Sequence, residues 1–150
     1  MIFTKKILVA VDLNMDSSEL LNTLREMDFL KHAEVHFVHV FNSFNYSFMF
    51  GDFPLVYPIE ADRKVIKDGV LRMLDEKVKG FLPKDFDGKM INQCLFSDDP
   101  KAKFCEYIKE ISPELVIIGT RLKHGIFESS FAHYVSRHSN ANLLLLKKGI

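Results

Sequence analysis

The stretch from residue 114 to residue 148 most constrains what this chain can fold into. It holds two short apolar runs, residues 115–118 (Leu-Val-Ile-Ile) and residues 143–146 (Leu-Leu-Leu-Leu), on either side of an amphipathic segment. Two apolar runs that flank one helical segment are typical of a βαβ unit whose parallel strands are covered on both faces. The loop that leaves the first strand then opens at the carboxyl edge of the sheet, where α/β folds place their ligands. We therefore expect any small-molecule site to involve residues 119–130.

Three further stretches predict strands and bring the expected number to five. Residues 6–11 (Lys-Ile-Leu-Val-Ala-Val) read as a buried central strand, and residues 34–40 and 90–96 are strand-like. Helices are expected at residues 16–30, 59–81, 99–111 and 128–139. This alternation predicts an α/β fold, a three-layer sandwich with a five-stranded parallel sheet.

Apolar side chains at helical spacing mark the faces by which the helices would pack. The first helix carries such a set at Leu20, Leu21, Leu24, Met27 and Leu30. The second carries Ile66, Val70, Met73, Leu74, Val78 and Phe81. Asp16 or Ser17 is the expected N-cap of the first helix. The third helix is expected to start at Asp98-Asp99-Pro100 and to end at Ser112-Pro113.

Composition limits the class of protein and its partners. With 150 residues, 47% of them hydrophobic and 27% charged, residues 1–150 are expected to form a single domain. The 20 basic and 20 acidic residues cancel, so neither nucleic acid nor an anionic membrane is expected as a partner. No apolar run approaches the ~20 residues of a membrane span, and the start lacks a signal-peptide core. We expect a cytoplasmic protein in which Cys94 and Cys105 are buried free thiols.

Residues 41–58 are unusually aromatic. Gly51, Pro54 and Pro58 interrupt the segment, and its aromatic side chains follow no stable period. They are Phe41, Phe44, Tyr46, Phe48, Phe50, Phe53 and Tyr57. A loop of this length inside a compact domain is usually functional, a lid or disordered. The aromatic side chains predict packing on the core, the sheet edge, a ligand or a second chain.

Several residues converge at the expected carboxyl edge of the sheet. Asp12 follows the first strand, Val40 ends the second, and Gly119 begins the loop after the fourth. A glycine-bearing loop that leads into a helix N-terminus can cradle a phosphate with its backbone N–H groups. Asp and Gly are also common at strand ends because they favour turns. Asp12 and Gly119 could therefore have a purely structural role instead of a binding role.

Four blocks of this sequence resemble the universal stress protein A family. They are residues 6–12 (Lys-Ile-Leu-Val-Ala-Val-Asp), 97–100 (Ser-Asp-Asp-Pro), 115–120 (Leu-Val-Ile-Ile-Gly-Thr) and 134–139 (Tyr-Val-Ser-Arg-His-Ser). Their order and spacing span nearly the whole chain. The resemblance implies a nucleotide-binding α/β fold of Rossmann-like, adenine nucleotide alpha hydrolase-like type, usually dimeric. Many members bind ATP through a loop of the form Gly-x2-Gly-x9-Gly followed by Ser or Thr.

This chain departs from that loop. Gly119 stands at the first glycine, but Leu122 occupies the second, and Ser129-Ser130 replaces the final pair. Only six residues separate Leu122 from Ser129 instead of nine, and Gly125 is a partial substitute. A side chain at either position blocks the close backbone approach that phosphates need. The loop resembles the branch of the family that does not bind ATP, where a Ser-Ser pair also occurs.

The resemblance still implies a nucleotide site, occupied or vestigial, with ATP as the possible ligand. Its residues would be Ala10, Val11, Asp12, Val40, Gly119, Thr120, Gly125, Ser129 and Ser130. Arg121, Lys123 and His124 either attract an anion or form a solvated basic turn. Serine is also a preferred helix N-cap without any ligand.

No pattern of metal ligands or catalytic residues is found. His36 and His39 lie three apart on a strand and face opposite ways. His133 and His138 lie five apart on a helix, off one face, and no carboxylate completes a ligand set. Ser129-Ser130 lacks the glycines of a nucleophile elbow. We therefore predict no catalytic and no metal-binding residues, and a protein that is more plausibly not an enzyme.

The last strand predicts an interface. Leu143, Leu144, Leu145 and Leu146 leave no polar face, and the resemblance places this strand at the sheet edge, where similar proteins pair it across a two-fold axis. We expect a homodimeric stress-response protein that acts through contacts with other proteins, without robust ATP binding. The alternatives are a nucleotide-binding switch or slow ATPase, and a carrier of another small ligand under the aromatic loop.

Overall fold

The computed structural model describes residues 5–11, 18–42, 60–80, 82–120, 122–123, 126–127 and 130–147. The strands are β1 (Lys6–Ala10), β2 (Glu34–Asn42), β3 (Lys89–Ser97), β4 (Leu115–Thr120), β5 (Leu122–Lys123), β6 (Ile126–Phe127) and β7 (Leu143–Lys147). The helices are α1 (Ser18–Arg25), α3 (Glu60–Lys79), α4 (Pro100–Ile111) and α5 (Ser130–His138), with a 3₁₀ turn η1 (Asp28–Leu30) after α1.

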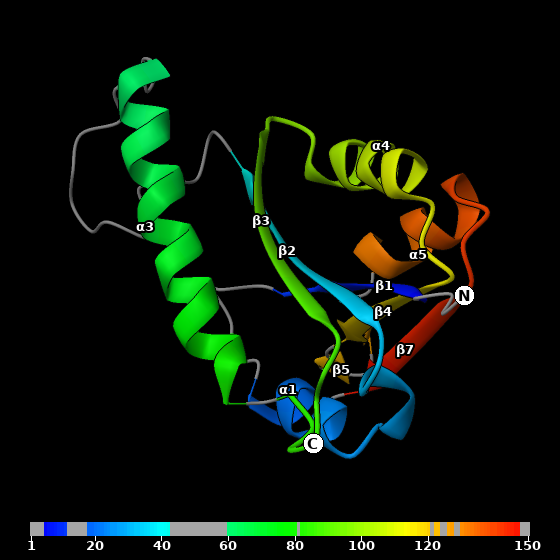
Figure 1. Ribbon diagram of the computed structural model, residues 1–150. Coiled ribbons are helices and arrows are strands. Elements are labelled where there is room, and N and C mark those ends of the chain that lie inside the picture. The colour runs from blue at the N-terminus through cyan, green and yellow to red at the C-terminus, as the bar shows by residue number, and fades with distance from the viewer. Residues whose placement is uncertain are drawn as a thin grey trace.

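Five strands form one parallel sheet in the order β3-β2-β1-β4-β7 (Figure 1). Every pair in this order is parallel. The apolar run of β1 lies at the centre, where Ile7, Leu8 and Val9 are at most 2% exposed. The predicted fold class and the positions of the five expected strands are confirmed.

Helices cover both faces of the sheet, as the sequence pattern predicted. On one face, Leu24 of α1 and Leu74 and Val78 of α3 pack against side chains of the central strands. On the other face, Phe104 and Ile108 of α4 pack with α5. Figure 1 shows α4 and α5 together on one side of the sheet and α3 on the other. The core is therefore two apolar layers separated by the sheet.

The first two expected helices differ in detail from the sequence pattern. α1 ends at Arg25, and the stripe continues through an extended Met27 into η1, so that Leu24 and Leu30 are both fully buried. In α3 the buried residues Val70, Leu74 and Val78 repeat every four positions. Met73 was predicted to be buried but is 49% exposed, because it precedes Leu74 by about 100° of helical rotation. Asp16, Ser17 and Phe81 lie outside the described residues.

The start and end of α4 are as predicted. The Asp99 side chain caps the helix by accepting a hydrogen bond from the Ala102 N–H at 3.3 Å, and Pro100 is the first helical residue. The helix ends at Ile111, and its C-cap Ser112 is left-handed with φ 47° and donates its N–H to the Ile108 carbonyl at 2.9 Å. Pro113 then prevents continuation. Local sequence chemistry thus decides both ends.

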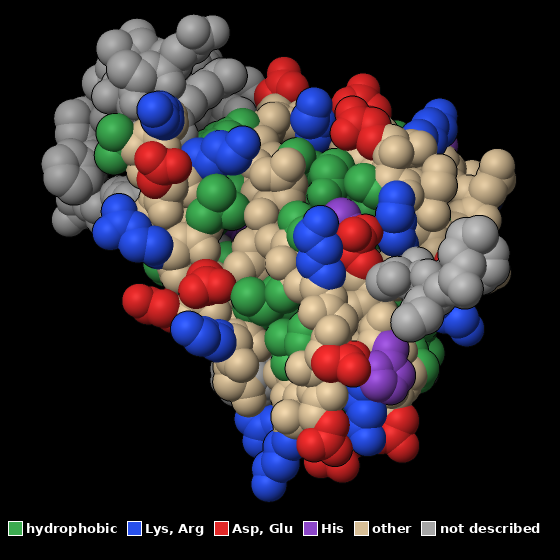
Figure 2. All heavy atoms as spheres, viewed as in Figure 1, with side chains coloured by type: hydrophobic (Ala, Val, Ile, Leu, Met, Phe, Trp, Pro, Cys, Tyr) green, Lys and Arg blue, Asp and Glu red, His purple; other side chains and the backbone are tan. Residues whose placement is uncertain are grey.

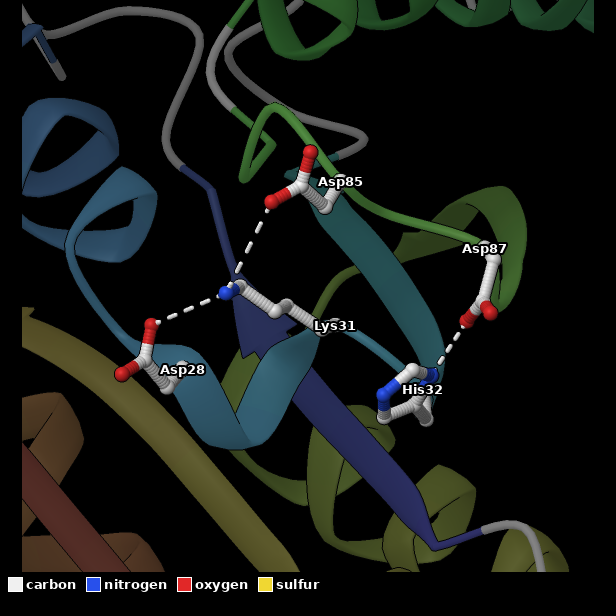
Figure 3. A network of polar contacts seen from close by, with 5 residues as sticks. All are labelled: Asp28, Lys31, His32, Asp85 and Asp87. Carbon is white, nitrogen blue, oxygen red and sulfur yellow. Dashed lines mark hydrogen bonds and ion pairs between the residues drawn. The ribbon is translucent and has the colours of Figure 1, made fainter.

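A turn before β3 is held against the segment before β2. The Asp87 and Gly88 N–H groups both donate to the Lys31 carbonyl, and Gly88 has no room for a Cβ, which would lie 2.0 Å from the Ala33 oxygen. On the surface of this contact, Lys31 reaches Asp28 at 3.4 Å and Asp85 at 3.8 Å, and His32 contacts Asp87 (Figure 3). The close backbone packing sets the position at which β3 starts beside β2.

Candidate functional site

The sheet brings together three strand ends that the sequence singled out. Ala10 of β1 lies beside Val38 of β2 and Ile118 of β4, and the Val11 N–H continues the ladder to the Val38 carbonyl at 2.9 Å. Val40 and Gly119 lie further along those neighbouring strands. Val40 was predicted to end the second strand, but β2 continues to Asn42 because it pairs with β3 as far as Ser97. Parallel strands end at one edge, so these residues form the carboxyl rim where α/β sheets bind ligands. Asp12 lies outside the described residues.

His39 also belongs to this rim. Its ring Nδ1–H donates to the Val11 carbonyl at 3.0 Å, and the side chain is 2% exposed. This hydrogen bond ties β2 to the end of β1 at the point where the chain leaves the sheet. The sequence analysis considered His39 only as a metal ligand. The signal for its burial was its place on one face of an alternating strand. Its role here is to position Val11.

The segment between β4 and α5 contains a feature that the sequence analysis missed. Leu122 pairs with Phe127 and Lys123 with Ile126 in a short antiparallel ladder, β5–β6. Gly119 was expected to open this loop but lies inside β4, where it pairs with Leu146 because β7 continues alongside. β4 therefore runs on to Thr120, and the described residues between β4 and α5 are those of the β5–β6 ladder.

The remaining predicted nucleotide-site residues divide into two groups. Thr120 ends β4 beside Lys147, and Ser130 is the first residue of α5. Arg121, His124, Gly125 and Ser129 lie outside the described residues, like Asp12.

The β5–β6 ladder affects which ligands this rim could bind. A phosphate cradle needs backbone N–H groups that are free to point at the anion. Leu122 stands where the ATP-binding pattern has its second glycine, and its backbone is part of the β5–β6 ladder. Ala10, Val11 and Val40 take no part in this ladder. The described residues of the rim are thus in place, and Leu122, at the position of the second glycine, belongs to a short ladder.

A second polar group lies at the opposite, amino end of the sheet. His36 is 6% exposed and uses both ring nitrogens, Nε2 with Glu34 Oε2 at 2.9 Å and Nδ1 with the Tyr107 hydroxyl at 3.2 Å. The hydrogen bond from His36 is the largest cause that lowers the pKa of Glu34, and the charges of Lys6 and Lys89 act in the same direction. Glu34 begins β2 beside Lys6, so this group is far from the carboxyl rim.

The pKa of Tyr107 is shifted upward, in contrast to that of Glu34. Burial raises the pKa of its hydroxyl first, and the nearby carboxylates of Glu110 and Glu34 raise it further. The hydroxyl therefore stays protonated and hydrogen-bonded. His36 faces Tyr107 of α4, whereas Phe37 and then His39 face the other side, as the alternation of a strand predicted.

The two cysteines are free and buried, as expected. Burial raises the pKa of the Cys94 thiol to about 12, with the Lys67 charge acting weakly the other way. The pKa of Cys105 is raised for the same first reason. Thiols in this state are poor nucleophiles and poor metal ligands, because both roles require the thiolate.

Within the described ranges, no three His, Cys, Asp or Glu side chains are grouped so that they could hold a metal ion. Among the described helices, none is long and apolar enough to cross a membrane.

β7 lies at one end of the sheet order and pairs with β4 alone among the described strands. Leu144 and Leu146 pack against the core on one face, and Leu143 against the core on the other. Leu145 is 46% exposed. The edge that the resemblance implied for the last strand is therefore present, with an exposed leucine on it.

Three solved structures show the same fold at low sequence identity. Universal stress protein UspA from Lactobacillus plantarum is 20% identical, with a TM-score of 0.63 over 95% of this chain and 97% of that chain. The universal stress protein from Archaeoglobus fulgidus in complex with dAMP is 18% identical, with a TM-score of 0.60 over 98% and 100%. An Arabidopsis thaliana family protein with AMP bound is 15% identical, with a TM-score of 0.60 over 97% and 92%.

A search of curated proteins found no match. The family model described as the universal stress protein family, in contrast, matches residues 4–147. That match covers nearly all of the 150 residues. The chain belongs to the universal stress protein family.

Proposed function

We propose that this universal stress protein is a homodimeric cytoplasmic regulator that acts through contacts with other proteins and does not bind ATP robustly. The observation that carries the proposal is the β5–β6 ladder, in which Leu122 pairs with Phe127. The ladder includes, at the position of the second glycine, a residue with a Cβ, which blocks the close backbone approach that a triphosphate needs. A regulator that lacks a triphosphate site has to act through its surfaces.

The β7 edge supports the homodimer. Its four leucines carry no charge that would deter pairing, and Leu145 is 46% exposed in the single chain. Two copies of β7 that pair across a two-fold axis would bury this leucine and join two five-stranded sheets. Such an interface is closed, so the assembly would stop at two chains.

A second candidate function is the binding of an adenine nucleotide as a switch or slow ATPase. It is favoured by two of the solved structures, one with AMP bound and one in complex with dAMP. Ala10, Val11 and Val40 of the rim take no part in the β5–β6 ladder. A ligand with one phosphate makes fewer demands on the altered loop than ATP does. The third candidate, a carrier with an aromatic lid, depends on the aromatic segment 41–58. Phe41 lies in β2 instead of in a loop, and residues 43–58 lie outside the described residues.

Native mass spectrometry of the freshly purified full chain distinguishes these functions. We expect a bare dimer that ATP, AMP and dAMP leave unchanged in mass, with CTP as the control for non-specific attachment. A ligand at 100 times its Kd would add about 2.7 kcal/mol of stability. Thermal unfolding with each nucleotide is therefore an independent readout.

One ATP per chain, retained with a thermal shift that CTP does not give, would overturn the proposal. AMP or dAMP binding without ATP binding would instead support the second candidate as a mononucleotide site.

A further inference from the structure

The second open edge of the sheet lies at β3. This strand has nine residues, Lys89–Ser97, and among the described strands it pairs with β2 alone. Its edge faces the viewer between α3 and α4 in Figure 1. The same strip in Figure 2 shows backbone and hydrophobic side chains, with charged side chains around it. Most of the strand is partly exposed.

The hydrogen bonds show which backbone groups of β3 point outward. The Lys89 N–H donates to Ala33 beside β2 at 3.1 Å, so Lys89 faces inward. In a parallel ladder successive residues alternate between the two sides. Ile91, Gln93 and Leu95 therefore also face β2. The backbone groups of the alternate residues, Met90, Asn92, Cys94 and Phe96, point away from the sheet.

One of these outward donors is occupied by a neighbouring side chain. The Cys94 N–H donates to Oε1 of Gln93 at 3.1 Å, which independently confirms that it does not serve β2. Gln93 thus bends back over the edge and satisfies a group that a further strand would otherwise satisfy. A flexible side-chain amide is a replaceable partner, since an incoming carbonyl offers the same acceptor.

The chemistry of the edge selects the kind of segment that fits. From Met90 to Ser97 the strand has no charged residue and no proline, the two devices that commonly protect an edge. On the α3 side, partly buried Leu71 packs against Val70 and Cys94 and leaves apolar surface beside the edge. A matching segment is extended and uncharged, with apolar residues at alternate positions.

We propose that the β3 edge is a strand-addition site for an extended, uncharged segment of a partner protein, and that Gln93 is its removable cap. The inference deepens the proposed function, on which it rests, by naming the surface used for protein contact. A strand added there would gain backbone hydrogen bonds along β3, with side-chain specificity on the two faces.

A second copy of this chain is a poorer fit to the same edge. In a permanent interface between two copies the edge would never be empty. The Cys94 N–H would then need no acceptor from the Gln93 side chain. If β7 closes a two-fold dimer, β3 pairing between copies would also link dimers into an open chain. The Gln93 side chain can satisfy Cys94 whenever the edge is empty, which suits a segment that binds reversibly. The occupant is therefore a segment of a partner protein.

The test uses the full chain and a display library of nine-residue peptides. Each peptide has Val, Ile, Leu or Phe at alternate positions and Thr, Ser or Gln between them. The best-enriched peptide is then labelled and titrated by fluorescence anisotropy. We expect Gln93→Ala to bind it about fivefold more tightly, since the peptide no longer displaces an internal hydrogen bond. Gln93→Lys, matched at the same site, should weaken binding by placing a charge at the edge.

Hydrogen exchange locates the binding on the strand. We expect the peptide to slow the outward amides of Met90 and Asn92, while those of Ile91 and Leu95 are slow throughout. N-methylation of the alternate peptide amides that face β3 should abolish binding, and methylation of the other set should not. Thermal unfolding of both Gln93 variants confirms that they fold.

Three outcomes would overturn the inference: no enriched peptide, equal affinity of both Gln93 variants, or protection confined to β7. Growth of Gln93→Ala beyond a dimer would identify a second copy as the occupant and also overturn it. Native mass spectrometry of the same samples tests the dimer and nucleotide state separately. A wild-type chain that binds ATP but shows the expected β3 protection would refute only the proposed function.

Discussion

Among the described residues, the two buried histidines each connect one element to another. His36 joins Glu34 of its own strand to Tyr107 of α4, and His39 joins β2 to the carbonyl of Val11. A polar group buried without a partner costs about 1–3 kcal/mol, so these pairings are conditions for burial. The two histidines therefore act in positioning elements, one at each end of the sheet.

Glu34 should make the stability of the protein depend on acid. Its folded-state pKa is lowered, chiefly by the hydrogen bond from His36. The resulting stability is fully present above the unfolded glutamate pKa of about 4.3 and is lost as the pH falls through the lower folded-state value. We expect Glu34→Gln to cost about 1–2 kcal/mol near neutral pH and progressively less on acidification.

Urea unfolding at a series of pH values measures this difference directly. Glu110→Gln, an exposed carboxylate one turn from Tyr107, is the matched control and should leave the acid dependence of the wild type in place. A constant gap between wild type and Glu34→Gln across the acid range would contradict the expected linkage.

At the scale of elements, close backbone contacts decide where strands and turns begin. The turn before β3 approaches the segment before β2 so closely that Lys31 accepts hydrogen bonds from both Asp87 and Gly88. The surface ion pairs around it are exposed and contribute little by comparison (Figure 3). The start of β3, and hence the position of its open edge, depends on this contact.

Gly88→Ala should therefore destabilise the fold. The added Cβ would lie 2.0 Å from the Ala33 oxygen, so the turn has to move away and lose its hydrogen bonds. We expect a loss of about 2–3 kcal/mol in the free energy of unfolding. Gly69→Ala is the control, since a Cβ there has nothing within 4 Å and the site is inside α3.

The control should gain about 0.5–1 kcal/mol, because alanine favours a helix interior over glycine. Chemical denaturation of both variants beside the wild type gives the two values. Equal stabilities of Gly88→Ala and the wild type would show that the contact is not required.

For the whole molecule, the two ends of the sheet have different chemistry. The β7 end presents four leucines, of which Leu145 is 46% exposed. The β3 end presents backbone groups with a Gln93 cap. We assign the first to the proposed dimer and the second to the proposed partner segment, so that one surface does not compete with the other.

Leu145→Lys tests the first assignment. An ammonium at the β7 edge would face its own copy across the two-fold axis, and like charges there oppose association. We expect the dissociation constant of the dimer to rise by about a hundredfold or more, with little change in monomer stability. Met73→Lys, at a leucine-sized side chain that is 49% exposed on α3, is the control.

Light scattering over a range of protein concentrations gives the dissociation constants. A Leu145→Lys protein that is still fully dimeric, with Met73→Lys unchanged, would place the dimer interface elsewhere.

The sequence by itself determined the features that depend on local chemistry and on period. The apolar runs of β1 and β7, the Asp99 cap and the Ser112-Pro113 end of α4 all follow from residue types near in the chain. These signals were sufficient for five strands, four helices and their layering. The glycine pattern was also sufficient to show that the loop after β4 departs from the ATP-binding form.

Only the tertiary structure decided what depends on residues far apart in the chain. The burial of His39 needs the Val11 carbonyl, and the exposure of Met73 follows from how α3 lies on the sheet. The β5–β6 ladder and the continuation of β4 to Thr120 arise from pairing between strands. The cap on β3 is visible only when one side of the strand is known to be open. Periodicity shows which side chains share a face, but hydrogen-bond partners are set by which strands meet.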